Sequence, residues 1–176
     1  MSEIRNDGTY VEVGGRPAVR FERRYPYPVE RLWQAVTDPG ELRHWFPSPN
    51  VEYDPREGGR ISLTGDPYDP EGSVGTVLIW DPPHRFAFEW GEDQLHLTIA
   101  PDGDGCRLEL LDLLATRGGA ARNGTGWDFC LAGLGRHLAG TDGDDGDFLP
   151  VLQQYIDAGL PDDGWRPGDG TPPPGT

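Results

Sequence analysis

Asp112 is the residue of this chain whose position is most suggestive of chemistry. It follows Leu108 and Leu110 at two-residue spacing, and alternate residues of a strand point to the same face of a sheet. Asp112 would then point inward, where a carboxylate needs a partner. It could act as a polar anchor at one end of an apolar pocket, with Arg117, His137 or a ligand hydroxyl beside it. The alternative, which the pattern favours because strand ends are poorly determined, is a bulge or rim position that exposes Asp112.

The histidines and the acidic run at 142–147 do not have the spacing of metal ligands. Metal-binding histidines commonly lie four residues apart on a helix or beside cysteine pairs. The histidines of this chain are scattered: His44, His84, His96 and His137. The acidic run has glycine fifth and aspartate sixth, where a calcium loop needs Asp or Asn and then Gly. The sequence therefore predicts neither a metal ion nor a cofactor.

Covalent and nucleotide chemistry also lack their sequence motifs. The chain has no Gly-x-Ser-x-Gly elbow, no Walker loop and no dinucleotide fingerprint. Cys106 and Cys130 lie in apolar stretches and are interpreted as reduced core thiols. We therefore predict no catalytic residues, and catalysis is the less favoured hypothesis.

The composition is acidic and rich in turn residues. The 26 glycines and 18 prolines favour short elements joined by tight turns. A net charge of −15 repels phosphate backbones and anionic lipid heads, so nucleic acid and membranes are not expected partners. Because there is no apolar leader and no uncharged apolar run of about 20 residues, we expect a cytoplasmic protein.

Hydrophobic periodicity predicts the elements that would position these side chains. Two β-rich runs, 9–13 and 17–25, flank a glycine turn and predict a hairpin. Short amphipathic helices are expected after Pro28 and after Asp38, which would cap the second one. Between residues 50 and 116 apolar residues alternate and turn residues separate the runs, which predicts a meander of about six antiparallel strands.

Helical spacing returns in the C-terminal part of the chain. One apolar face is formed by Trp127, Leu131, Leu134 and Leu138. The glycines of this helix each cost about 0.8–1 kcal/mol relative to alanine, so the helix must be stabilised by packing on the sheet. Their missing Cβ atoms also leave space. A further helix is expected over 147–158, followed by a disordered tail around a lone Trp165.

This order of elements and three of its motifs resemble a known family. The motifs are Pro-Val-Glu-Arg-Leu-Trp at 28–33, Asp38-Pro39 followed by Trp45-Phe46, and Gly126-Trp127 in the last long helix. Together they resemble the bacterial family named after the activator of the heat-shock-protein-90 ATPase, within the START-like or SRPBCC superfamily. The resemblance implies an α+β helix-grip fold, in which a curved antiparallel sheet wraps around a long C-terminal helix and two short helices follow the first core strand.

The resemblance also predicts how the chain is divided. It covers about residues 17–141, which would form the START-like domain. Residues 1–16 are then an N-terminal extension with a hairpin strand, residues 142–161 an acidic linker with a short helix, and residues 162–176 a disordered tail.

The family resemblance implies a cavity between the sheet and the helix, which in superfamily relatives holds lipids, sterols, polyketides or hormones. Our leading hypothesis is non-catalytic binding of a small hydrophobic molecule; the alternative for the same apolar face is a filled core. The expected pocket residues are Trp33, Trp45, Phe46, Trp80, Phe86, Phe88, Trp90, Leu97, Leu110, Asp112, Trp127, Cys130, Leu131 and Leu134.

Two other functions stay open. One is an enzyme of the cyclase or aromatase type, in which Asp112, His137 or Arg117 would transfer protons. The other is a stress-response protein that interacts with a chaperone, as the family name suggests. The exposed edge of the N-terminal hairpin is compatible with a homodimer as well as a monomer.

Overall fold

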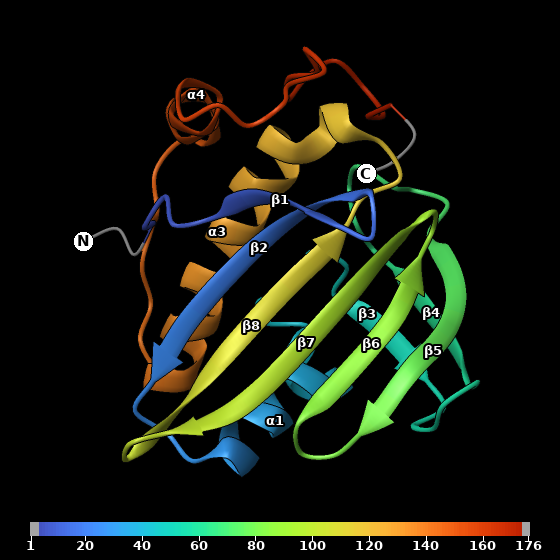
Figure 1. Ribbon diagram of the computed structural model, residues 1–176, viewed down its shortest axis with the longest axis vertical. Coiled ribbons are helices and arrows are strands. Elements are labelled where there is room, and N and C mark those ends of the chain that lie inside the picture. The colour runs from blue at the N-terminus through green and yellow to red at the C-terminus, as the bar shows by residue number, and fades with distance from the viewer. Residues whose placement is uncertain (1–3, 174–176) are drawn as a thin grey trace.

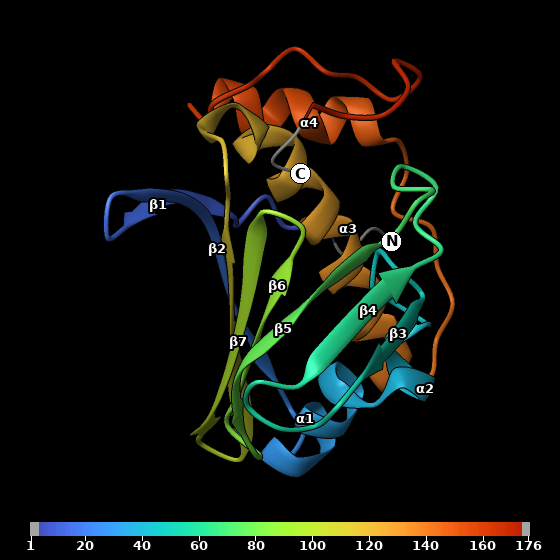
Figure 2. The ribbon, with the colours of Figure 1, turned by 90° about the vertical axis from the view of Figure 1, so that its right-hand side faces the viewer.

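The computed structural model describes residues 4–173 and consists of one curved antiparallel sheet with helices on its concave side (Figures 1 and 2). The strands are β1 (Thr9–Val13), β2 (Arg16–Tyr25), β3 (Asn50–Tyr53), β4 (Arg60–Thr64), β5 (Ser73–Asp81), β6 (Arg85–Trp90), β7 (Asp93–Asp102) and β8 (Gly105–Leu113). The helices are α1 (Val29–Thr37), α2 (Pro39–Leu42), α3 (Ala120–Ala139) and α4 (Phe148–Asp157), with a 3₁₀ turn at Arg117–Gly119. This is the helix-grip fold that the sequence predicts.

The sheet has the strand order β1-β2-β8-β7-β6-β5-β4-β3. The six strands from β3 to β8 each pair with their neighbour in the chain, so the predicted meander is confirmed. β2 pairs with β8 far along the sequence, with Phe21 opposite Leu110, and this pairing joins the N-terminal hairpin to the meander. The hairpin turns at Gly14 and Gly15, whose φ angles of +59° and +82° favour glycine.

The two short helices form a corner that is held by side-chain hydrogen bonds. Asp38 accepts a hydrogen bond from the backbone N–H of Gly40 at 2.8 Å, which is the cap expected for α2. The indole N–H of Trp45 donates to the carbonyl of Ala35 at 2.9 Å. These two bonds hold the start of α2 and the Trp45 side chain in place against α1.

The helix α3 begins at Ala120, six residues before the Gly126-Trp127 pair that marks this helix in the sequence. Ala120 and Ala121 are fully buried, although alanine adds little to an apolar pattern and so gave no periodic signal. A Cβ on Gly124 would lie 3.3 Å from a Leu160 methyl carbon. This glycine allows the segment after α4 to pack closely on α3.

The segment 162–173 corrects the prediction of a disordered tail. It has no helix or strand, but it crosses the start of α3, and Trp165 is only 8% exposed (Figure 2). The guanidinium of Arg122 contacts Asp163 at 2.8 Å and lies 6.0 Å from the Trp165 ring. Composition fails here because a few specific contacts with α3, rather than apolar content, hold the segment. Residues 174–176 of the predicted tail, and 1–3 of the predicted extension, lie outside the described residues.

A buried ion-pair network attaches the N-terminal segment to the helices. Arg23, 3% exposed on β2, contacts both Asp7 and Asp128 at 2.7 Å. Asp128 is fully buried and also accepts a hydrogen bond from the Tyr155 hydroxyl at 2.7 Å. The network therefore links β2, α3 and α4.

No helix within residues 4–173 is long and apolar enough to cross a bilayer.

Candidate functional site

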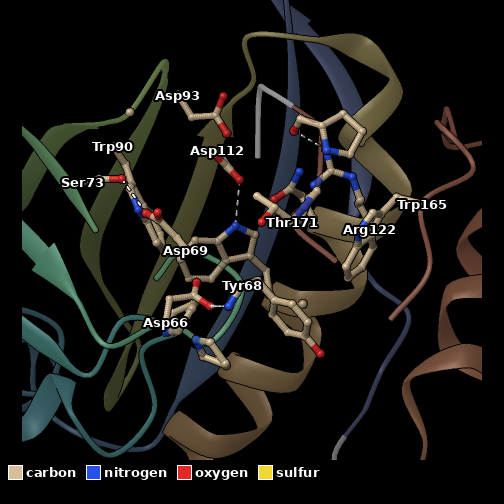
Figure 3. Close-up of a pocket in the computed structure, with 18 of the residues that line it drawn as sticks. Asp66, Tyr68, Asp69, Ser73, Trp90, Asp93, Asp112, Arg122, Trp165 and Thr171 are labelled. Carbon is tan, nitrogen blue, oxygen red and sulfur yellow. Dashed lines mark hydrogen bonds between the residues drawn. The ribbon is translucent and has the colours of Figure 1, made fainter. Parts of the chain in front are cut away.

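A cavity of about 650 Å³ lies where the ends of β6 and β8 meet the first half of α3 (Figure 3). Because these strands are antiparallel neighbours, the last residues of β6, the first residues of β7 and the last residues of β8 lie at the same end of the sheet. The loop between β4 and β5 and the segment 165–173 close the other sides. The cavity is therefore built from segments that are far apart in the sequence.

Aromatic rings form much of the cavity wall. Trp90 on β6 and Trp127 on α3 meet edge to face, with ring centroids 5.9 Å apart. Tyr68 of the β4–β5 loop makes a similar contact with Trp165 at 5.4 Å, and Phe148 at the start of α4 also lines the space. Such rings present large apolar surfaces with defined orientation.

Gly126 leaves the helix side of the cavity open. It lines the cavity, and a Cβ placed on it would find no atom within 4 Å apart from its chain neighbours and the helix backbone. The space that the sequence suggested for the helix glycines therefore exists at Gly126. It does not exist at Gly124, where a Cβ would meet Leu160 at 3.3 Å and Val19 at 3.5 Å.

Asp112 is buried at the cavity wall, so the favoured expectation of an exposed rim position is wrong. It is 4% exposed, and its Oδ2 accepts a hydrogen bond from the Trp127 indole N–H at 2.8 Å. The register of β8 with its neighbours continues without a bulge, pairing Asp112 with Val19 and Leu95. Alternation from the preceding leucines therefore does hold up to this residue.

The partners that we expected for Asp112 lie elsewhere. The guanidinium of Arg117 lies 5.6 Å from the ring of Tyr10 on β1. His137 lies ten residues beyond Trp127 on α3, which corresponds to about 15 Å along a helix. There it contacts Glu41 at 3.0 Å. The partner of Asp112 is Trp127, which the sequence pattern indicates only as part of the apolar helix face and as a pocket residue, although a buried indole N–H needs an acceptor.

Asp93 forms a second buried carboxyl next to Asp112 (Figure 3). It is 4% exposed and accepts a hydrogen bond from the backbone N–H of Ala115 at 2.8 Å. Sequence reasoning missed it because it follows a Gly-Glu turn. A signal was present, since Asp93 shares the two-residue spacing of Leu95 and Leu97 and hence their face of the sheet.

Both carboxyls have raised pKa values. Burial, followed by the neighbouring carboxyl of Asp93, raises the pKa of Asp112 to about 7, against the opposing effects of the Trp127 hydrogen bond, Arg16 and Arg122. Burial raises the pKa of Asp93 to about 6, although the Ala115 N–H and the nearby arginines lower it. Near neutral pH this wall of the cavity can thus hold, release or share protons.

Among residues 4–173, Arg122 is the one basic residue that lines the cavity. It is 5% exposed, and its Nε lies 2.8 Å from Asp163, so its charge is already compensated. Its Nη2 also donates to the carbonyl of Pro173 at 3.4 Å. Arg122 thus attaches the C-terminal segment to the cavity.

The structure brings four of the expected pocket residues to the cavity, namely Trp90, Asp112, Trp127 and Cys130. The others pack in or against the hydrophobic core: Trp33, Trp45, Phe46, Trp80, Phe86, Phe88, Leu97, Leu110, Leu131 and Leu134. In that region the rings contact one another, as in the Trp33–Trp80 pair at 5.3 Å. The sheet and the helix therefore enclose a filled core at one end and a cavity at the other.

Comparison with known proteins gives one family and many similar structures. The sequence profile described as Activator of Hsp90 ATPase homolog 1-like protein matches residues 26–139. No curated protein matches the chain. The crystal structure of CalU16 from Micromonospora echinospora is 26% identical with a TM-score of 0.69, over 86% of this chain and 92% of that one.

Two further structures extend this comparison. Protein EF2215 from Enterococcus faecalis, of unknown function, has a TM-score of 0.69 at 14% identity, over 86% of this chain and 89% of that one. DynU16, a protein of the dynemicin biosynthetic locus, is 26% identical with a TM-score of 0.58, over 69% of this chain and 47% of that one. At 14% identity, the similarity to EF2215 supports the fold and nothing about function.

Proposed function

Because the chain belongs to the Activator of Hsp90 ATPase homolog 1-like family of the START-like, or SRPBCC, superfamily, we propose that it binds a small hydrophobic molecule without transforming it. The observation that carries this proposal is the cavity of about 650 Å³ beside α3. Its volume is within the range of roughly 300–1,000 Å³ that is usual for small-molecule sites.

The lining of the cavity has the composition expected of a ligand site. Aromatic rings supply most of the apolar surface, and Asp112 places one polar group on it. Small-molecule sites commonly combine an apolar wall with few polar groups that orient the ligand. The hydrogen bond from Trp127 fixes the Asp112 carboxyl, so this anchor is oriented before a ligand arrives.

A pair of variants at Gly126 tests the proposal. Because no atom beyond the chain neighbours and the helix backbone lies within 4 Å of a Cβ at this position, Gly126→Phe should place its ring in the cavity without displacing the helix. Gly126→Ala is the matched control, since it adds one methyl group to a large space. Neither variant should disturb the core, which circular dichroism and thermal unfolding would check.

Binding is measured with the neutral dye Nile red, and native mass spectrometry shows any molecule that copurifies. We expect the wild type and Gly126→Ala to bind the dye with similar affinity and Gly126→Phe to lose at least about tenfold, or roughly 1.4 kcal/mol. Equal dye binding by a folded Gly126→Phe protein, with unchanged copurification, would show that the cavity is not the binding site.

The two buried carboxyls favour a second candidate, acid–base catalysis of the cyclase type. General acids and bases work best when their pKa lies near the working pH, and Asp93 and Asp112 have pKa values of about 6 and 7 beside an apolar cavity. The test is turnover of any molecule identified by mass spectrometry. A product formed by the wild type and not by Asp112→Asn would replace the binding proposal with this one.

The proposal also includes a protein partner, a location in the cell and an oligomeric state. The family description is the basis for chaperone interaction as an additional role, which a pull-down with measurement of ATPase stimulation would test. We propose a cytoplasmic location, and either a monomer or a homodimer through the edge strand β1.

A further inference from the structure

We propose that the cavity selects ligands that carry a protonated amine on an aromatic or aliphatic body. This inference rests on the proposed function, because it names the ligand class for the same cavity. It combines three observations: an excess of carboxylates in the lining, aromatic rings around them, and two buried carboxyls without a direct cationic partner.

The cavity has a strongly negative lining. Its carboxylates come from the β4–β5 loop, the β6–β7 turn and the sheet: Asp66, Asp69, Glu92, Asp93 and Asp112. The basic residue of the lining, Arg122, contacts Asp163 at 2.8 Å. A cleft lined by charge of one sign focuses the electric field and raises the local concentration of ligands of the opposite sign.

The aromatic rings of the wall are suited to a cation as well as to an apolar body. The faces of tryptophan and tyrosine rings attract ammonium and guanidinium groups that lie within about 6 Å of the ring centre. The protein already provides one example, since the Arg122 guanidinium lies 6.0 Å from the Trp165 ring. Trp90 and Trp127 offer comparable rings next to the buried carboxyls.

Asp93 and Asp112 are where a bound ammonium group would gain most. They come from adjacent strands, since Asp112 pairs with Leu95, two residues from Asp93. The two nearby arginines, Arg16 and Arg122, bind other groups. Arg16 on β2 donates to the backbone carbonyls of residues 92, 113 and 114, and Arg122 on α3 contacts Asp163. Within residues 4–173 neither arginine forms an ion pair with these carboxyls.

A ligand amine would therefore supply a positive charge that the fold does not provide. The remaining group facing Asp112 is the Trp127 indole, which donates to Oδ2. That bond stabilises the ionised form but adds no charge, and burial together with mutual repulsion opposes ionisation. A bound ammonium group would favour ionisation of the pair, so amine affinity should increase as the pH rises from 5.5 to 8.

Three matched probes test the charge preference: 1-naphthylmethylamine, 1-naphthalenemethanol and 1-naphthoic acid. They share one ring system and differ in the charge of the substituent. With calorimetry at pH 8, where the amine is still protonated, we expect the amine to bind at least about tenfold more tightly than the alcohol, and the acid to bind more weakly than both.

Charge variants assign the preference to the cavity. Asp112→Asn should lower amine affinity about tenfold and alcohol affinity by much less, because the asparagine amide can still hydrogen-bond a hydroxyl but carries no charge. Asp69→Asn, in the β4–β5 loop, is a second variant that does not depend on the buried pair. The matched control is Glu52→Gln on β3, which makes the same change in net charge at an exposed position outside the cavity lining; it should leave both affinities unchanged.

The outcomes separate this inference from the binding proposal. If the alcohol or the acid binds as well as the amine, or if no probe binds while Nile red does, the inference is wrong and the proposed hydrophobic site stands. If neither the probes nor Nile red bind, both are wrong. An amine affinity that falls equally in Glu52→Gln and Asp112→Asn would indicate the overall charge of the protein rather than the cavity, and would also refute the inference.

Discussion

Replacing Asp112 by asparagine should stabilise the protein at alkaline pH and have little effect in acid. Asparagine keeps the shape of the side chain, and its carbonyl oxygen can still accept the hydrogen bond that Trp127 donates at 2.8 Å. The variant therefore removes the buried charge and retains the contact. It resembles the protonated form of the wild-type residue at every pH.

The expected size of the effect follows from the pKa of Asp112. This pKa is raised from 3.8 to about 7, mainly by burial and by Asp93. A carboxyl whose pKa is higher in the folded state stabilises the fold below the unfolded pKa, and this contribution disappears as the pH rises through the folded pKa. Ionisation of Asp112 therefore lowers the unfolding free energy of the wild type by at most roughly 4 kcal/mol. This decrease takes place as the pH rises from about 4 to about 7.

Urea unfolding of both proteins at pH 4 and pH 8 measures this difference. We expect similar stability at pH 4 and a more stable Asp112→Asn protein at pH 8, with the Glu52→Gln protein following the wild type at both values. A variant that is equally or less stable at pH 8 would refute the reasoning, because it would mean that the ionised carboxylate is stabilised in the fold and its pKa is not raised.

Three further predictions concern α3 and the segments packed on it. Gly126→Ala should raise the unfolding free energy by about 0.8–1 kcal/mol, because alanine favours the helix and its methyl group meets only its chain neighbours and the helix backbone within 4 Å. Gly124→Ala should gain less, because its methyl group would meet close neighbours. Chemical denaturation would check both variants. Asp128→Ala should cost about 3–5 kcal/mol, because it leaves the buried Arg23 without one partner, and a loss below 1 kcal/mol in urea unfolding would contradict this. Trp165→Ala should release the segment 162–173 from α3, which limited proteolysis would detect as faster cleavage there with β-sheet content unchanged.

The elements of the fold could be predicted because each one has a local pattern. Alternation of apolar residues marked the strands from β3 to β8, and Asp38-Pro39 marked the start of α2. The first turns of α3 have a weaker pattern, because alanine and glycine replace the larger apolar residues that reveal a helix. Pairing of β2 with β8 had no local signal, because the two strands lie far apart in the sequence.

The candidate site could be predicted only where it lies on regular elements. Trp90, Asp112 and Trp127 point inward by strand or helix spacing, and Asp93 would have followed from the same rule. Tyr68 and the segment 165–173 belong to stretches without periodicity. Nothing in a local pattern indicates which distant element such stretches will cover.

The sequence by itself determined which faces of the strands and helices are apolar, because periodicity is a property of neighbours along the chain. It also determined the acidic character that excludes nucleic acid as an expected partner. Only the tertiary structure decided that the inward side chains fill the core around Trp33 and Trp80 but leave a cavity beside Gly126. Inward-pointing side chains meet or leave a space between them according to how segments distant in the sequence come together. Here such segments place a pair of buried carboxyls and the segment around Trp165 on the wall of one cavity.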